Sequence, residues 1–119
     1  MRLLKKEESE VLEALLGMVP SSTKPPSEDE LFAVDLADGG MGSIRLTDKS
    51  DRPRKMGREL VTAHYIDEDG VPVIISINLD QDGRLFEIDF WKVNYDPLKH
   101  YPLPEELHEG QPTVPKASA

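Results

Sequence analysis

The chain has 119 residues, contains no cysteine and carries a formal net charge of −9. This length corresponds to one domain, and the lack of cysteine excludes disulfides, thiolate zinc sites and cysteine nucleophiles. The negative charge disfavours binding to nucleic acid or anionic lipid and favours encounter with a basic protein. No run approaches the roughly 18 apolar residues of a membrane span. The N-terminus turns acidic before a signal-peptide core can form, so we expect a cytoplasmic protein.

The first half of the chain predicts one amphipathic helix followed by two strands. Apolar residues recur at spacings of three, four and seven between Leu4 and Val19, which predicts a helix with one buried stripe over residues 3–19. Ser27 followed by Glu30 matches a capping box for a short helical turn. The other segments follow in order: a loop over 21–27, a strand over 31–37, a glycine-rich turn over 38–42, a strand over 43–47 and a polar loop over 48–57.

The second half predicts a three-stranded antiparallel meander. Strands over 59–66, 71–79 and 84–95 are separated by two connections that end in Asp-Gly, which is a strong hairpin signal. Five prolines beyond Tyr95 end the regular structure. We therefore predict an α+β domain over residues 1–108, in which the N-terminal amphipathic helix packs on a mainly antiparallel sheet of about five strands. A disordered C-terminal tail is expected over residues 109–119.

The alternation also predicts which side chains share a face of the sheet, because a slip of one residue exchanges the two faces. Pairing apolar with apolar residues places one set on the face that the helix covers: Val73, Ile75, Ile77, Phe86, Ile88 and Phe90. The opposite face then carries a half-polar set, as expected of a sheet with one wet side: Thr62, His64, Ile74, Ser76, Asn78, Glu87, Asp89 and Trp91.

The hairpin at residues 78–89 contains a pattern that resembles a cation site. Its sequence, N-x-D-x-D-G-x5-D, mimics an EF-hand calcium loop, which places oxygen ligands at alternate positions and a glycine at the sharp bend. The flanking residues predict strands rather than the helices of an EF-hand, and a tight hairpin explains the same residues. We expect no cofactor, and a small-ligand or calcium-binding domain using this hairpin is the alternative function.

Two further features of the half-polar face bear on function. His64 has Asp89 as a neighbour two strands away, and Glu87 shares a face with Asp89, so an acid–base pair is conceivable. Solvated carboxylates explain these residues equally, and we predict no enzyme. Trp91 is expected to lie outward and to be ringed by acid, as in an interaction hot spot. The alternative is that the segment 95–103 buries it.

Two segments carry a distinctive pattern: DGGMGS at residues 38–43 and L-F-E-x-D-x-W-K-V-x-x-x-P-L at residues 85–98. They resemble a family of short bacterial proteins of unknown function, and this resemblance implies a shared fold unit rather than a particular reaction. A looser likeness in kind is to the immunity proteins of bacterial toxin–immunity systems, including contact-dependent growth inhibition. These are short, acidic, cytoplasmic α+β domains without catalytic residues.

We therefore predict a non-catalytic protein-binding module, and specifically an immunity protein that neutralises a basic, nuclease-like toxin domain. An acidic surface can block a basic cleft because opposite charges steer the two proteins together and pair across the interface. The predicted contacts are Asp80, Asp82, Glu87, Asp89 and Trp91, with Asp67, Glu68 and Asp69 as a rim.

Overall fold

The computed structural model describes residues 1–26, 31–48 and 52–112. Its elements follow in chain order: β1 (Arg2–Leu3), α1 (Lys6–Leu16), the 3-10 helix η1 (Ser21–Thr23), β2 (Phe32–Asp35), β3 (Ile44–Thr47), β4 (Met56–Ile66), β5 (Pro72–Asp80), β6 (Leu85–Lys92), the 3-10 helix η2 (Pro104–Glu106) and β7 (His108–Glu109). No helix in this part of the chain has the length and apolar character needed to cross a membrane.

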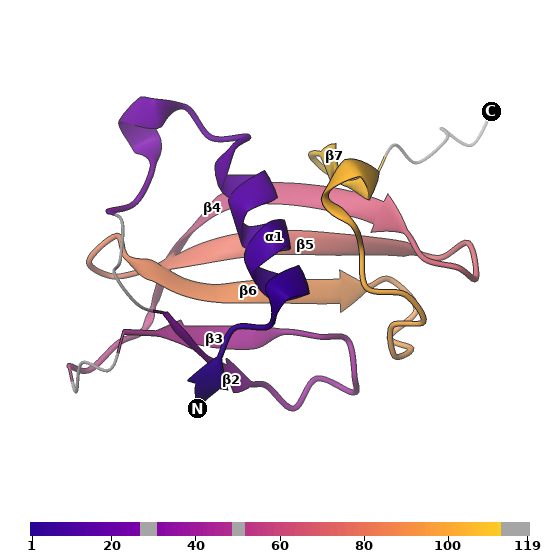
Figure 1. The fold of residues 1–119 in the computed structure, drawn as a ribbon, viewed down its shortest axis with the longest axis horizontal. Coiled ribbons are helices and arrows are strands. Elements are labelled where there is room, and N and C mark those ends of the chain that lie inside the picture. Colours follow the sequence, from indigo (N-terminus) through magenta and orange to yellow (C-terminus); the bar gives the residue numbers. More distant parts are fainter. Residues whose placement is uncertain (27–30, 49–51, 113–119) are drawn as a thin grey trace, which may run out of the picture.

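The strands form a single antiparallel sheet in the order β1-β2-β3-β6-β5-β4-β7 (Figure 1). The α+β class and the three-stranded meander β4-β5-β6 are confirmed. Over the described residues the sheet has seven strands rather than the predicted five, because two short edge strands, β1 and β7, add to it. Each consists of only two residues. Such a segment is too short to show an alternation of its own, and it becomes a strand by pairing with a longer neighbour.

Helix α1 is shorter than the predicted 3–19. It begins after Lys5, whose backbone N–H donates to the Glu8 carboxylate at 2.8 Å, and it ends at Gly17. Arg2 lies in extended backbone instead, where its guanidinium binds both Glu8 and Asp35 at 2.7 Å. The predicted apolar stripe is correct, since its central residues are buried against the sheet: Val11, Leu12 and Leu15.

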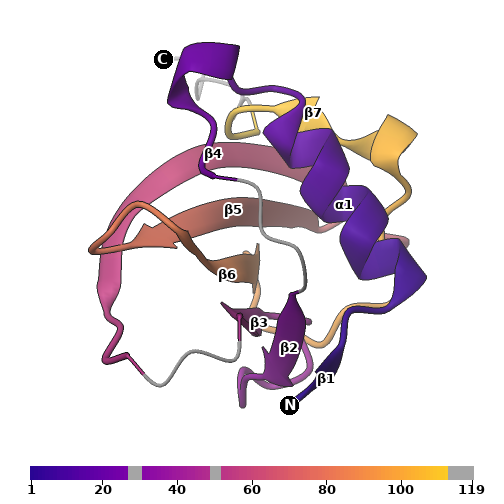
Figure 2. The same cartoon turned by 60° about the vertical axis from the view of Figure 1, so that its left-hand side comes forward.

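The helix and the C-terminal segment lie on the same face of the sheet (Figures 1 and 2). The pairing register places Ser76 between Thr62 and Asp89, and Ile74 between His64 and Trp91. These side chains are on the opposite face, as predicted. No described helix covers that face, which we call the open face (Figures 1 and 2).

Phe86 departs from the predicted register. Asn78 pairs with Glu87, but Leu79 pairs with Leu85, so Phe86 is the extra residue of a β-bulge. The Phe86 ring lies 4.1 Å from the guanidinium carbon of Arg45, outside the core cluster. The prediction that Phe86 faces the helix was therefore wrong, and Leu85 occupies the core in its place.

Other boundaries differ modestly from prediction. β4 begins at Met56 rather than Glu59, and β6 ends at Lys92 rather than near Tyr95. The capping box predicted at Ser27 and Glu30, and residues 113–119 of the predicted tail, lie outside the described residues.

Candidate functional site on the open face of the sheet

Asp80, a predicted contact, belongs to the turn that joins β5 to β6. One carboxylate oxygen accepts the backbone N–H groups of Asp82 and Arg84 at 2.8 and 3.0 Å. The other lies 2.9 Å from Nε of Arg54 and 3.0 Å from Nη1 of Arg52. Burial by itself would raise the pKa of Asp80, but these hydrogen bonds outweigh it and hold the pKa at about 2. The side chain has no exposed surface with which to meet a partner.

The same contacts argue against the calcium alternative. The oxygens of Asp80 are occupied by the turn and by arginine, and the Asn78 amide donates to Glu87 at 2.8 Å on the open face. Within the described ranges, no group of three or more histidines and carboxylates is arranged to hold a metal ion. The EF-hand-like spacing is therefore explained by a hairpin turn.

The acidic residues of the β4–β5 turn also form ion pairs within the protein. Nζ of Lys92 lies 2.9 Å from Asp67 and 2.7 Å from Asp69, and the lysine side chain is fully buried. Burial by itself lowers the pKa of Lys92, but the two carboxylates raise it overall. Asp82 is likewise 2.9 Å from Arg52. Among the predicted rim residues, Glu68 and Asp69 are exposed, and Asp69 is the one of these two that pairs with Lys92.

The open face retains carboxylates in a network of polar side chains. Ser76 links β4 to β5, because its hydroxyl donates to Glu59 at 3.0 Å and lies 3.1 Å from the Thr62 hydroxyl. Glu87 accepts from Asn78 and is 3.8 Å from Arg45. These contacts tie the polar side chains to one another across neighbouring strands.

Asp89 is a half-buried carboxylate on the open face. No ion pair reaches it in the described part of the chain. Burial raises its pKa, and the negative charges of Glu87 and Asp38 raise it further. A half-buried carboxylate with a raised pKa is one that would gain from a cation brought by a partner.

Trp91 lies outward beside an exposed apolar patch. It pairs with Ile74, and its ring centroid is 6.1 Å from that of Tyr95. Alternation along the strands places further apolar side chains at the same end of the open face. We call this group the Trp91 patch: Ile66, Pro72, Ile74, Trp91, Val93 and Tyr95. Its exposed members are Trp91 at 39%, Val93 at 37%, Ile66 at 52% and Tyr95 at 69%.

The outward position of Trp91 is confirmed, and its burial under residues 95–103 does not occur. That segment packs mainly on the other face of the sheet, where the rings of Tyr101 and Phe90 are 5.3 Å apart. Tyr95 is held near Trp91 with a φ of 64°, a left-handed conformation that costs energy in a tyrosine.

His64 does not form the acid–base pair that its neighbours suggested. Its Nδ1 lies 2.7 Å from the carbonyl oxygen of Gly110 and donates to it, and its ring is 5.5 Å from that of His108. Asp89 belongs to the next row of the register, opposite Ser76, and no hydrogen bond joins it to His64 among the described residues. These side chains therefore do not form a coupled catalytic pair.

The internal pairing of the hairpin acids had no signal in the sequence. Arg52 and Arg54 precede β4, whereas Asp80 is the last residue of β5. Lys92 ends β6, whereas Asp67 lies in the turn after β4. Composition predicts a negative surface without showing which carboxylates the fold neutralises.

The chain was compared with protein families, curated proteins and solved structures. The model of a family described as "Domain of unknown function (DUF6984)" matches residues 1–102. No curated protein and no solved structure matches the chain.

Proposed function

The chain belongs to the DUF6984 family, and on that premise we propose that it is a non-catalytic protein-binding module that docks a basic protein on the open face of its sheet. The observation that carries this proposal is the Trp91 patch beside Asp89. Large apolar side chains gathered in one exposed place are typical of an interaction site, particularly where a polar rim surrounds them.

Burial of the Trp91 patch supplies the favourable free energy in this proposal. Each apolar square ångström removed from water contributes roughly 25 cal/mol, and a centrally placed tryptophan is a common hot spot. Tyr95 lies beside Trp91 with its ring largely exposed. A partner that covers both rings would gain from aromatic area whose orientation is already set by the sheet and by the Tyr95 backbone.

Charge selects a basic partner. Glu87 and Asp89 lie on the same face as Trp91, Glu68 is exposed in the β4–β5 turn, and the whole chain has a net charge of −9. A cation placed beside Asp89 would offset the burial and the repulsion from Glu87 and Asp38 that together raise its pKa. The contacts in this proposal are therefore Trp91, Asp89, Glu87 and Glu68, while Asp67, Asp69, Asp80 and Asp82 stabilise the hairpin turns.

The finer proposal is that the partner is a nuclease-like bacterial toxin domain and that the chain is its immunity protein. The likeness in kind to immunity proteins supports it, as does the fit of an acidic face to a basic cleft. A chain without cysteine suits the reducing cytoplasm in which such a protein would act.

Affinity capture from source-cell lysate with matched variants tests the proposal. Trp91→Ala is compared with Leu103→Ala, which removes a similarly exposed apolar side chain from the C-terminal segment. We expect a basic protein that is captured by the wild type and by Leu103→Ala, with roughly 30-fold weaker binding to Trp91→Ala. The proposal would be contradicted if Trp91→Ala captured the same proteins as the wild type with equal affinity, or if the captured partner were acidic.

The charge argument is tested on the captured partner by measuring association rates at several salt concentrations. Asp89→Asn and Glu68→Lys should slow association and weaken its salt dependence, because less attraction steers the encounter. Glu105→Lys, an exposed change on η2, is the matched control. The toxin proposal adds that the partner has nuclease activity, which the wild-type chain inhibits and Trp91→Ala does not.

A further inference from the structure

The outer edge of β4 is unpaired over half of its length. β4 spans Met56–Ile66 and pairs with β5 along this length, interrupted by two register shifts. On its other side it pairs with β7 only at Ala63 and His64. No described strand pairs with this edge over residues 56–61. An open edge of this kind presents backbone N–H and C=O groups that can bind another strand.

β7 shows that this edge accepts a strand. His108–Glu109 pair antiparallel with β4, and the backbone N–H of Gly110 donates to the carbonyl of Thr62 at 2.8 Å. Gly110 has a φ of 84°, a left-handed conformation at which the chain leaves the edge. A strand that continued the line of β7 would meet the unpaired residues of β4.

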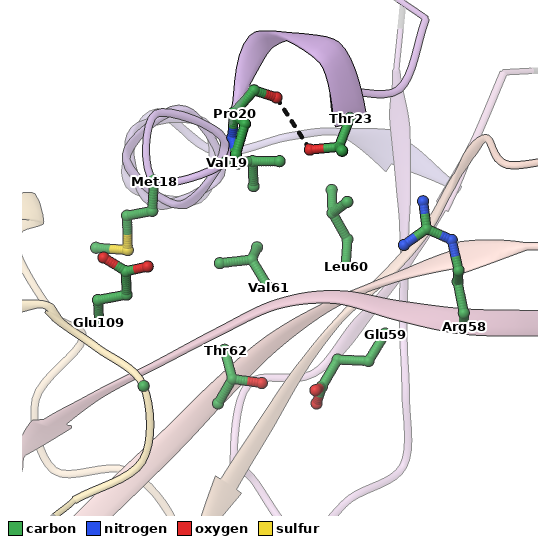
Figure 3. Close-up of a pocket in the computed structure, with 11 residues that line it drawn as sticks. Met18, Val19, Pro20, Thr23, Arg58, Glu59, Leu60, Val61, Thr62 and Glu109 are labelled. Carbon is green, nitrogen blue, oxygen red and sulfur yellow. Dashed lines mark hydrogen bonds between the residues drawn. The ribbon is translucent and has the colours of Figure 1, made fainter.

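A groove lies where that continuation would run. It has a volume of about 410 Å³ and lies between the end of α1 and the edge of β4. Figure 3 shows Leu60 and Val61 pointing from β4 toward Val19. Both face the groove because the register shift between Glu59 and Val61 makes Leu60 an extra residue in the strand. The groove is apolar at its centre, where Met18 and Pro20 also line it.

Charged side chains lie at the borders of this groove. Figure 3 shows Glu109 beside Met18, with Glu59 and Arg58 along β4. Glu109, Glu59 and Arg58 are all exposed. In a strand added to β4, alternate side chains would face the groove and the others would face away from it. Glu59 accepts a hydrogen bond from Ser76 and so lies on the side that faces away from the groove, and in a chain of net charge −9 it favours basic residues at those positions.

We propose that the edge of β4 over residues 56–61 binds an extended peptide as an added antiparallel strand in line with β7. Leucine- or valine-sized side chains of the peptide fill the groove beside Val19, Leu60 and Val61, and the alternate residues are lysine or arginine. This site is separate from the Trp91 patch, and it would hold whether or not the open face docks a protein.

The test uses the full chain and a fluorescein-labelled octapeptide of alternating leucine and lysine. Saturable binding is expected, with backbone amide NMR shifts confined to residues 56–62 and Val19. The same peptide N-methylated on the amides that would face β4 should bind roughly tenfold or more weakly, because each lost backbone hydrogen bond reduces the affinity. Replacing lysine with glutamate in the peptide should also weaken binding.

Variants of the chain localise the site. Leu60→Lys should abolish binding by placing a charge in the groove, whereas Leu103→Lys and Trp91→Ala should bind the peptide as the wild type does. An amide spectrum confirms that each variant is folded, and the N-methylated peptide tests the proposal independently of Leu60→Lys. No saturable binding, equal affinity for the N-methylated peptide, or shifts centred on Trp91 would each overturn it.

Discussion

The ammonium group of Lys92 lies 2.9 Å from a carboxylate oxygen of Asp67, and neither side chain is exposed to solvent. Lys92 also lies 2.7 Å from Asp69 and donates to the carbonyl of Pro97 at 3.3 Å. The backbone N–H of Lys99 donates to Asp67 at 2.9 Å. These contacts join the end of β6 to the β4–β5 turn and to the start of the C-terminal segment. The lysine of the W-K-V element therefore has a structural role.

We predict that Lys92→Met destabilises the protein by about 3–5 kcal/mol, because it leaves the buried Asp67 carboxylate without its cation. Urea unfolding measures the change in the free energy of unfolding. The double variant Lys92→Met with Asp67→Asn should lose less than Lys92→Met alone, since it removes the uncompensated charge while keeping an acceptor for Lys99. A loss below about 1 kcal/mol for the single variant would contradict the role assigned to this pair.

The central strands could be predicted because their alternation records burial directly. Val73, Ile75 and Ile77 are fully buried on the helix side of β5, and the Asp-Gly turns at both ends of β5 provide the chain reversals. The outward position of Trp91 follows from the same alternation. Where one face of a strand is buried and the other is solvated, apolar and polar residues alternate, and this alternation is sufficient to predict which side chains face the core.

Features that depend on contacts distant in sequence could not be predicted. Lysine is usually a surface residue, and Lys92 is buried because it pairs with the carboxylates of Asp67 and Asp69 in the β4–β5 turn. Phe86 looks like a core residue, but a bulge turns it toward Arg45. Both cases come from tertiary geometry that overrides local preference, and so the sequence could not separate free carboxylates from paired ones.

We predict that Asp80→Asn lowers the free energy of unfolding by about 3 kcal/mol, because a buried carboxylate that binds Arg52 and Arg54 is lost. Asp82→Asn is the matched control on the same turn. Its side chain is 56% exposed, and its loss should stay below about 1 kcal/mol. Comparable losses from the two variants would show that Asp80 has no special role in the turn.

The Asp80 carboxylate also predicts a dependence of stability on pH. Its pKa is lowered from 3.8 to about 2 in the folded protein, so its contribution is complete above pH 3.8 and disappears as the pH falls through about 2. The difference in unfolding free energy between wild type and Asp80→Asn should therefore narrow over this range. Urea titrations at successive pH values measure it, and a constant difference would contradict the assignment.

His100 should titrate above its ordinary pKa of 6.5. Its Nε2 lies 2.6 Å from the Glu106 carboxylate, and this hydrogen bond raises the pKa of His100 despite partial desolvation. The resulting stabilisation is complete below pH 6.5 and is lost as the pH rises through the folded pKa. NMR titration of the His100 ring should show the raised pKa in the wild type and in Glu105→Gln. Glu106→Gln should return it toward 6.5, and an unchanged value there would remove Glu106 as the cause.

Gly57 occupies a position in β4 where no side chain fits. An added Cβ would overlap the backbone carbonyl of Asp80, because the register shift between Met56 and Arg58 brings the two backbones together. We predict that Gly57→Ala costs about 1–3 kcal/mol in unfolding free energy, since the strand must move to relieve the overlap. Gly17→Ala is the control, because this glycine has a right-handed φ of −66° and its added Cβ would approach no closer than 3.4 Å to its neighbours. That control should change stability by less than about 1 kcal/mol. Equal behaviour of the two variants in urea unfolding would show that β4 is free to shift at this point.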